Sequence, residues 1–557
     1  MQTYKYIIAV LLLGSLLPAC KKDNFLNRLP QDALTEETFF KNENDLKLFC
    51  NQFYSSLPVQ SPLNDNNSDN LVPRNADVFL SGQYTIPTSG GGWSASDWSG
   101  IRNCNYFLDH YQKADAEDSV KDKYAGEARF FRAYYYWSKV KQFGDVPWIA
   151  TDLTDSSAAL YAPRDPHKMV MDSVLTDLDF AVDHLPAAAE AGRLNKYIAL
   201  ALKGRICLWE GTFRKYHNLG DDKPFLQAAA DASLQIISSG LYDIYTTGHP
   251  DQDYYNLFVQ TDLSSIKETI MSATYIKDVL THNLTRQINE AGTGWSKDFI
   301  NSFLCTDGLP ISLSHLYKGD DSLDEEVINR DPRLKQMVAT RGSVVLSIGG
   351  SPDTLALPRI GTNITTTGYE IIKNKSSDPE QWNANQSTLG LFIFRYAETL
   401  LIYAEAKAEL GECDQQVLDM TINKLRDRVG MPHMIIANLV KDPDSDFPDL
   451  PVLIDEIRRE RRIELAGEGS RFDDILRWAA GKVIENPMTI LGMKLVPAVK
   501  AQYPADQVRD IPLDANGYIR VYPSVSARKW DDKMYLYPIP IQEMTLNPSI
   551  KQNPGWD

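Results

Sequence analysis

The sequence predicts a mainly α-helical protein in which tetratricopeptide-like helix pairs form a scaffold that carries long loops and a few short strands. Three observations support this prediction. Long segments of the first half carry apolar residues at helical spacing, a middle region is rich in Gly, Pro, Asn, Thr and Asp, and helical periodicity returns toward the end. The diagnostic tetratricopeptide pattern is incomplete, so we expect repeat-like pairs and not a regular array.

Four long helical patterns occupy the first half of the chain. The first runs from Lys121 to Phe143 and stops before Gly144, with Pro147 just beyond, as the C-terminus of a helix does. Similar patterns follow at 166–185, 195–213 and 224–239. Gly204, among small residues of the third pattern, would let a neighbouring helix approach closely.

From about residue 241 to 390 the sequence predicts loops, with short strands at Ser343–Ile348 and Gly368–Lys373. Helices return at about 394–410, 414–429, 451–466 and 472–480. Because helical blocks flank the irregular block, we expect residues 20–557 to form one compact body. Its three parts would be a helical region 20–240, a loop-rich region 241–393 that carries loops of the ligand site, and a helical region 394–557.

The N-terminus has the pattern of a bacterial lipoprotein export signal. Lys5 precedes an apolar run from Ile7 to Leu17 that is too short to span a bilayer, and the run leads into Leu17-Pro18-Ala19-Cys20. Apart from Pro18, this matches the sequence that precedes an acylated cysteine. We therefore expect residues 1–19 to be removed and Cys20 to carry a lipid anchor, palmitate among its acyl chains. The alternative is an ordinary secretory signal cut near Ala19.

Composition excludes several functional classes. The net charge of -17 argues against nucleic acid and against electrostatic binding to anionic lipid headgroups. Five cysteines follow Cys20, namely Cys50, Cys104, Cys207, Cys305 and Cys413; they are scattered and contain no C-x-x-C pair, which predicts free, buried thiols. No zinc-protease, serine-hydrolase or phosphate-loop motif occurs, so we predict no catalytic residue, no metal and no cofactor.

Two charged stretches invite a functional interpretation, and we favour a structural one for both. The first stretch is Arg458–Arg462. In the helix that contains it, spacings of three and four residues predict the ion pairs Asp455–Arg459, Glu456–Arg459 and Arg461–Glu464. Together with Arg395, Glu398 and Glu405, these residues would form ion pairs that hold the C-terminal helices together. Asp442, Asp444 and Asp446 have the alternate spacing of a calcium loop, but Pro443 and Phe447 interrupt that motif, which favours a solvated acidic loop.

The best candidate for a ligand site is the aromatic stretch between Leu71 and Trp98. Three glycines, Gly90–Gly92, directly precede Trp93, which predicts that Trp93 and Trp98 both lie in a loop. Trp295 has a similar Gly-rich setting. A sugar needs a flat aromatic ring beside hydrogen-bonding groups. The candidate ligand-binding residues are therefore Arg74, Asn75, Asp77, Tyr84, Trp93, Trp98, Asn103 and Trp295. The competing interpretation is that the tryptophans pack under their loops.

Several segments, in order along the chain, resemble the SusD/RagB family of outer-membrane nutrient-binding lipoproteins. They are FLNRLPQDALTEETFF at Phe25–Phe40, ARFFRAYYYWSKVKQFGDVPWI at Ala128–Ile149, TDGLPI at Thr306–Ile311, DPRL at Asp331–Leu334, FRYAETLLIYAEAKAELG at Phe394–Gly411, IRRERRIELAGEGSRFDDILRW at Ile457–Trp478, and the ending LYPIPIQEMTLNPSIKQNPGWD. The resemblance covers essentially the whole chain and implies a SusD-like fold.

The resemblance also implies a function. Such a protein binds a glycan or peptide without cleaving it and caps a SusC-like TonB-dependent transporter, into which it hands the ligand, and its N-terminal loop region contributes aromatic residues to the glycan site. One departure concerns localisation. Surface export in this family is associated with acidic residues just after the cysteine, whereas here Lys21 and Lys22 precede Asp23. The expected location is the cell-surface side of the outer membrane, with the periplasmic side left open.

Three rival functions stay open at the sequence level. The ligand could be a peptide and not an oligosaccharide. The protein could be a surface glycoside hydrolase, which needs two carboxylates roughly 5 to 10 Å apart in a cleft. It could also be a helical scaffold that binds only protein, and this rival predicts no exposed aromatic platform.

Overall fold

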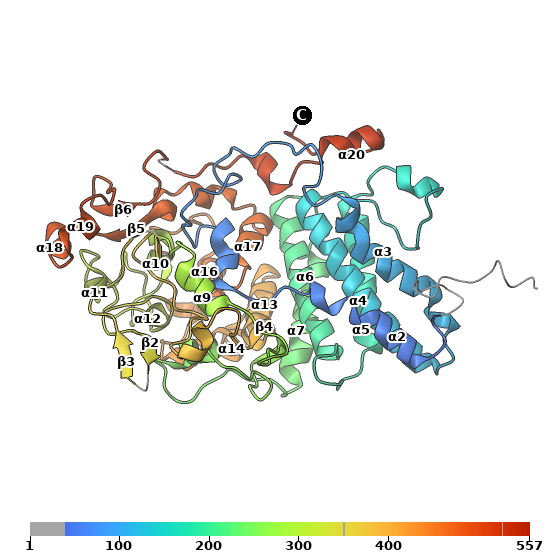
Figure 1. Ribbon diagram of the computed structural model, residues 1–557, viewed down its shortest axis with the longest axis horizontal. Helices are drawn as coiled ribbons and strands as arrows, with labels where there is room; N and C mark the ends of the chain where they lie inside the picture. Colours follow the sequence, from blue (N-terminus) through green and yellow to red (C-terminus); the bar gives the residue numbers. More distant parts are fainter. Residues whose placement is uncertain (1–38, 349–350, 362, 526, 557) are drawn as a thin grey trace, which may run out of the picture.

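The computed structural model describes residues 39–348, 351–361, 363–525 and 527–556, and helices dominate it (Figure 1). Cys20 and most of the Phe25–Phe40 segment lie outside the described residues, so the lipid anchor stays a prediction. Within the described ranges, no helix has both the length and the apolar character needed to span a membrane.

Nineteen α-helices and six strands follow one another along the described chain. The helices are α2 Glu43–Asn51, α3 Ala95–His110, α4 Asp118–Phe143, α5 His167–His184, α6 Lys196–Tyr216, α7 Lys223–Ser238, α8 Asp253–Leu257, α9 Leu284–Glu290, α10 Lys297–Ser302, α11 Leu323–Glu326, α12 Arg333–Met337, α13 Tyr396–Glu409, α14 Gln415–Met420, α15 Ile422–Val429, α16 Val452–Glu464, α17 Arg471–Arg477, α18 Pro497–Lys500, α19 Ala505–Val508 and α20 Ile541–Leu546. The strands are β1 Thr269–Ala273, β2 Val344–Ile348, β3 Ser351–Thr354, β4 Leu391–Arg395, β5 Leu491–Lys494 and β6 Tyr518–Arg520.

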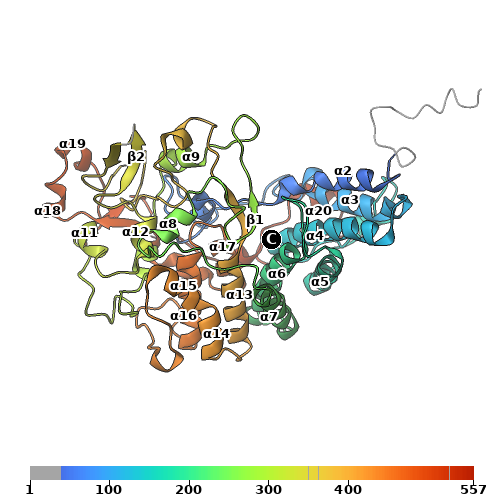
Figure 2. The ribbon, with the colours of Figure 1, turned by 90° about the horizontal axis from the view of Figure 1, so that it is seen from below.

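The long helices α2 to α7 lie side by side and form one half of the molecule (Figure 1). α4 packs on α5 and α6 packs on α7, which confirms the predicted helix pairs, and α13 from the C-terminal part lies against α7. α4 ends where expected, because Gly144 adopts φ 72° and its N–H bonds the Val140 carbonyl. The short α20, near the C-terminal end of the chain, returns to this half of the molecule (Figure 2).

The other half holds the short helices, the loops and three separate two-stranded antiparallel sheets, β1–β4, β2–β3 and β5–β6. The predicted strand at Ser343–Ile348 is confirmed as β2. The predicted strand at Gly368–Lys373 is wrong: within the described residues this segment makes one isolated bridge, between Ile371 and Val338. The predicted helix 414–429 is two helices, α14 and α15, separated at Thr421.

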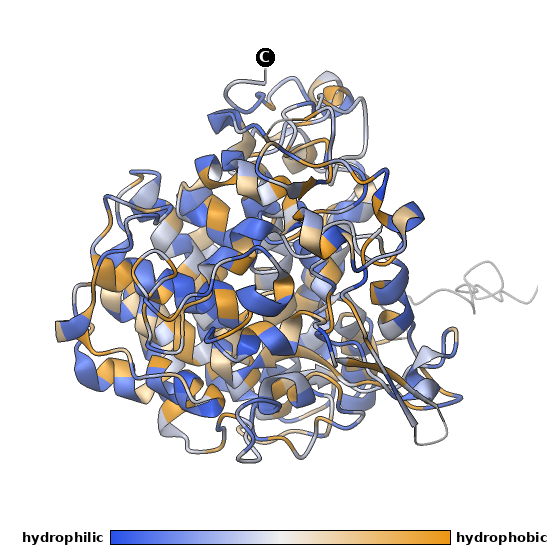
Figure 3. Cartoon of the chain, turned by 90° about the vertical axis from the view of Figure 1, so that its left-hand side faces the viewer, coloured by the Kyte–Doolittle hydropathy of each residue, from blue (hydrophilic) through white to orange (hydrophobic). Residues whose placement is uncertain are grey.

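Hydrophobic and hydrophilic residues alternate along the helices, as an amphipathic scaffold requires (Figure 3). The largest buried apolar cluster joins α2 to α7 with α13 and α16, and a second lies under the loop-rich half. The five cysteines of the described residues are free, four of them buried and Cys413 partly exposed.

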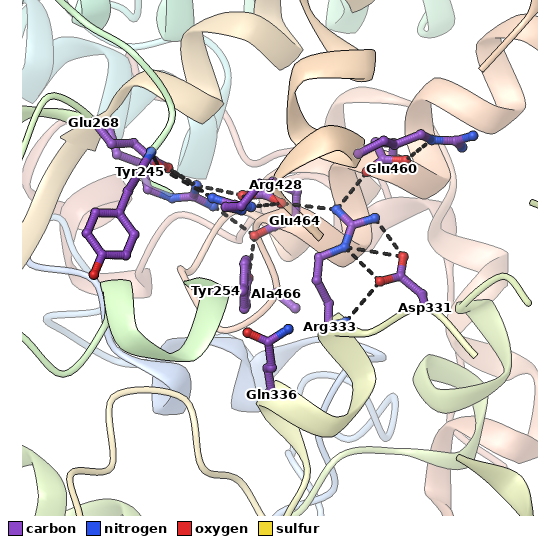
Figure 4. Close-up of polar contacts among 12 residues, drawn as sticks. Tyr245, Tyr254, Glu268, Asp331, Arg333, Gln336, Arg428, Glu460, Glu464 and Ala466 are labelled. Carbon is purple, nitrogen blue, oxygen red and sulfur yellow. Dashed lines mark hydrogen bonds and ion pairs between the residues drawn. The ribbon is translucent and has the colours of Figure 1, made fainter. Parts of the chain in front are cut away.

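A buried network of ion pairs connects the C-terminal helices with the loop-rich half (Figure 4). The fully buried Glu464 accepts hydrogen bonds from Arg428 at 2.6 Å, from Arg395 at 2.7 Å and from Arg333 at 3.0 Å. Burial by itself would raise the pKa of Glu464, but the three guanidinium groups hold this pKa well below its usual range. Asp331 binds the same Arg333 from the other side.

The predicted structural role of the charged stretch is therefore confirmed, but two predicted pairs are wrong. Of the three expected intrahelical pairs only Glu456–Arg459 forms, at 3.2 Å. Asp455 instead pairs with Lys441 at 2.7 Å, and Arg461 pairs with Asp474 at 2.9 Å. Helical spacing describes one helix alone, whereas these side chains reach partners on neighbouring segments.

Candidate functional site

Two of the predicted site residues, Trp93 and Trp98, line a cavity of about 620 Å³. Its walls are the N-terminal part of α3, the segment 147–161 with a short 3₁₀ helix at Ala158–Tyr161, and α20 with the residues after it. We call it the aromatic cavity. Its volume falls in the range of small-molecule sites.

The residues just before α3 place Trp93 and Trp98 at the start of this helix. Gly90, Gly91 and Gly92 all have positive φ, and they bring the chain to Trp93 in a turn that side chains would strain. Ser94 and Asp97 then form a capping box that starts the helix. The prediction that Trp98 lies in a loop is therefore wrong, because it is the fourth residue of α3.

The half-buried ring of Trp98 is held from two sides. Trp93, buried against Phe143, meets it edge to face with ring centroids 5.3 Å apart. The Lys139 ammonium lies 5.2 Å from the Trp98 centroid and donates to the Gly92 carbonyl at 2.5 Å. Burial lowers the pKa of Lys139 to about 8, with the Asp97 carboxylate acting in the opposite direction. The ring is thus fixed before any ligand arrives.

The other walls supply exposed apolar surface. Tyr161 is 63% exposed and Leu546 is 61% exposed, although both line the cavity together with the exposed Leu160. Exposed apolar side chains that gather around one cavity, unlike single ones scattered over a surface, mark an interaction site. The sequence interpretation missed these residues because they come from segments distant from Trp98 along the chain. The only local signal was the pair Leu160-Tyr161 within a polar turn region.

Polar groups border this apolar surface. Arg102 and Asp152 pair at 3.2 Å, and the buried Asn105 donates to the Ile149 carbonyl at 2.7 Å. Glu543 also lines the cavity, and burial raises the pKa of its carboxyl group. Asp155 adds a second carboxylate to the lining. An aromatic face beside donors and acceptors is the arrangement that recognises a sugar ring, with its apolar C–H face and hydroxyl edges.

The other six predicted site residues lie outside the aromatic cavity, so the structure does not join them to Trp98, and four of the six belong to the segment 74–84. The exposed Arg74 contacts Asn363 at 3.3 Å, and Asn75 is its exposed neighbour. Asp77 caps the following turn by accepting from the Leu80 N–H at 2.8 Å. Tyr84 packs against Phe79, Tyr537 and Trp556.

The remaining two candidates also have structural contacts. Asn103 belongs to α3 but donates to Gln52 at 2.9 Å on another side of the helix. Trp295 is 0% exposed, and its indole N–H donates to the Met337 carbonyl at 3.0 Å. The prediction of an exposed platform at Trp295 is wrong, and the competing interpretation, a tryptophan packed under its loop, is confirmed there.

The described residues offer no group of three or more His, Cys, Asp or Glu side chains that could hold a metal ion. In the acidic stretch whose spacing resembles a calcium loop, Asp442 binds Arg459 at 2.7 Å and the Ser312 hydroxyl at 2.7 Å. These contacts use the carboxylate for local structure.

Two family models match the chain. One, described as the SusD family, matches residues 267–556, and the other, described as starch-binding and associating with the outer membrane, matches residues 25–208. Among curated proteins, a SusD-like protein of Formosa agariphila is 25% identical over 87% of this chain and 93% of its own length.

Solved structures show the same fold. A SusD-like carbohydrate-binding protein from Bacteroides fragilis aligns with a TM-score of 0.71 at 24% identity, over 92% of this chain and all of the other. A second structure, solved with a xylogluco-oligosaccharide, aligns with a TM-score of 0.60 at 19% identity, over 92% of this chain and 96% of the other.

Proposed function

This chain belongs to the SusD family, and from that membership and the aromatic cavity we propose that it binds a nutrient oligosaccharide without cleaving it and delivers the sugar to a partner SusC-like, TonB-dependent transporter. The protein would work as a lipoprotein on the surface of the outer membrane. The relative solved with a xylogluco-oligosaccharide supports a glycan as the class of ligand.

The observation that carries the proposal is the fixed, half-exposed Trp98 ring in a cavity that combines apolar surface with polar edges. Stacking a sugar on this ring would cover the exposed apolar surface of Tyr161 and Leu546, while Arg102 and Glu543 offer partners to hydroxyl groups. Because Trp93 and Lys139 already hold the ring, little side-chain entropy is lost on binding.

A glycan array with the purified full chain tests this function directly. We expect binding to at least one family of oligosaccharides, with the applied oligosaccharide recovered intact. An array of peptides run in parallel tests the peptide-binding alternative. Binding to peptides alone, or to neither array, would contradict the proposal.

Two carboxylates in the lining of the aromatic cavity make glycoside hydrolysis the second candidate function. Glu543 and Asp155 both line the aromatic cavity, and partial burial raises the pKa of the Glu543 carboxyl, as a general acid requires. Reducing-end assays on bound oligosaccharides distinguish the two. Products that form with the native chain but not with Glu543→Gln would establish hydrolysis.

The lipid anchor is tested by fractionation. Cys20 follows the apolar segment that predicts export, and the family model that matches residues 25–208 is described as associating with the outer membrane. Cys20→Ala is expected to move the protein from the membrane to the soluble periplasmic fraction. A membrane-bound variant would refute the anchor, and protection from protease added to intact cells would count against surface exposure.

A further inference from the structure

The charge in the wall of the aromatic cavity is mainly negative. As the described residues form it, the lining contains three charged side chains, Arg102, Asp155 and Glu543. The Arg102 side chain is 70% exposed and already pairs with Asp152 at 3.2 Å. Lys139 lies outside the lining. A bound sugar therefore meets two carboxylates and one guanidinium group that has a partner of its own.

The two carboxylates are open to a ligand. In the part of the chain that the structure describes, neither Asp155 nor Glu543 forms an ion pair or a side-chain hydrogen bond. Burial raises the pKa of the half-buried Glu543 carboxyl, and no neighbouring cation lowers it. An ionised carboxylate can only accept hydrogen bonds. Both groups therefore need donors, which a ligand in the cavity can supply.

Much of the donor capacity of the wall is used by the protein itself. The side-chain amides of Asn105 and Asn547 each donate to a backbone carbonyl, at 2.7 Å and 2.9 Å. The Ser99 hydroxyl donates to the Ser96 carbonyl at 2.7 Å. The wall thus offers a ligand strong acceptors and few free donors. This balance suits a ligand rich in hydroxyl groups and disfavours one that brings negative charge.

We propose that Asp155 and Glu543 make the aromatic cavity selective for uncharged oligosaccharides and exclude acidic ones, which carry uronate or sulfate groups. This inference rests on the proposed function, because it names the class of sugar bound at the same site. The oxygens of the two carboxylates accept from hydroxyl groups of a ring that stacks on Trp98. An acidic group in the same place would lose hydration beside charges of its own sign.

Calorimetric titration of the full chain near neutral pH tests the selectivity. The probes are maltohexaose, cellohexaose, laminarihexaose and mannohexaose, each compared with its C6-oxidised form, in which carboxylates replace the primary hydroxyl groups. We expect saturable binding of at least one neutral hexasaccharide, and binding of its oxidised form at least about tenfold weaker. Raising the NaCl concentration from about 0.05 M to about 0.5 M should narrow this difference, because salt screens the repulsion.

A charge-removing variant separates repulsion from the mere loss of a hydroxyl group. The double variant Asp155→Asn/Glu543→Gln keeps the size and the acceptor oxygens of both side chains. It is expected to bind the oxidised hexasaccharide about tenfold more tightly than the native chain does, and the neutral one within about threefold of the native affinity. Asp353→Asn/Asp506→Asn is the matched control, because it changes the net charge equally at two exposed residues outside the cavity. This control should discriminate as the native chain does.

The outcomes distinguish a failure of this inference from a failure of the proposed function. Oxidised hexasaccharides that bind the native chain as tightly as the neutral ones would overturn the selectivity and leave glycan binding intact. Native discrimination in Asp155→Asn/Glu543→Gln, or lost discrimination in Asp353→Asn/Asp506→Asn, would show that the two carboxylates do not cause it. If no hexasaccharide binds in either form, the result contradicts the proposed function, and this inference falls with it.

Discussion

Three tryptophans with similar sequence settings have different roles, and their neighbours explain why. The glycine before Trp295 is required for packing and not for exposure, because a Cβ at Gly294 would lie 2.2 Å from the Thr367 hydroxyl oxygen. At Trp93 and Trp98, by contrast, the glycines form a turn that leads into a capped helix. Glycine-rich flanks alone could not distinguish these cases, because close approach and loop freedom select the same residue.

The buried role of Trp295 predicts a large loss of stability on truncation. Trp295→Ala removes a fully buried ring that packs on Phe299 and leaves a cavity, so we expect it to lower the free energy of unfolding by about 3 to 5 kcal/mol. Urea denaturation measures this loss. Tyr161→Ala, at a largely exposed residue, serves as control and should change stability by less than about 0.5 kcal/mol. Equal stabilities of the two variants would refute the core assignment.

At the scale of elements, the long helices were predictable because their apolar periodicity extends over several turns. α4, α5, α6 and α7 lie within a few residues of their predicted ranges. α3 was missed because its first turn is made of small polar residues, and only the Ser94–Asp97 capping box marks its start. The ion pairs of α16 were mispredicted for a related reason, since tertiary partners override helical spacing.

The close packing of α6 is the second prediction. A Cβ at Gly204 would already lie 3.2 Å from the Ser233 hydroxyl of α7 and 3.7 Å from Ile402 of α13. Gly204→Leu is therefore expected to lower the free energy of unfolding by about 1 to 3 kcal/mol through overpacking, as is Ala404→Leu in the buried face of α13. Gln235→Leu, on the exposed face of α7, is the control. Unchanged melting temperatures for both test variants would show that these helices do not meet as described.

At the scale of the whole molecule, the buried ion pairs predict how stability depends on pH. Burial would raise the pKa of Glu405, but Arg477 and Arg461 lower it to about 2. Since an unfolded glutamate titrates near pH 4.3, the unfolded chain binds more protons between about pH 4.5 and 2. The stabilisation that the paired Glu405 contributes is therefore fully present above about pH 5. It is lost as the pH falls through that window, and the loss in the free energy of unfolding is on the order of 3 kcal/mol.

Urea midpoints measured from pH 7 to pH 2.5 check this expectation. Asp446, whose side chain is 25% exposed, acts in the opposite sense: partial burial and the Asp298 charge raise its pKa to about 7, so its contribution to the free energy of unfolding falls as the pH rises from about 4 to 7. The decline below pH 4.5 is thus the signature of the paired glutamates. Stability that stays constant down to pH 3 would contradict the charge network.

The aromatic cavity also belongs to this scale, and it was the least predictable feature. The aromatic cavity joins α3, the 147–161 segment and α20. No periodicity or motif specifies which distant segments meet. Leu546 and Glu543 therefore had no sequence signal, and Tyr161 had only the apolar pair Leu160-Tyr161 in a polar region. The division into regions 20–240, 241–393 and 394–557 of one body stays a prediction.

The central claim is that an oligosaccharide stacks on Trp98, and a calorimetric titration of Trp98→Ala with an oligosaccharide found on the array tests it most directly. We expect binding at least about tenfold weaker than that of the native chain, with the variant still folded at the temperature of the titration. Asn103→Ala, on the same helix but outside the cavity, is the matched control and should bind as the native chain does. Native affinity in Trp98→Ala, or a loss of binding in Asn103→Ala instead, would contradict the account.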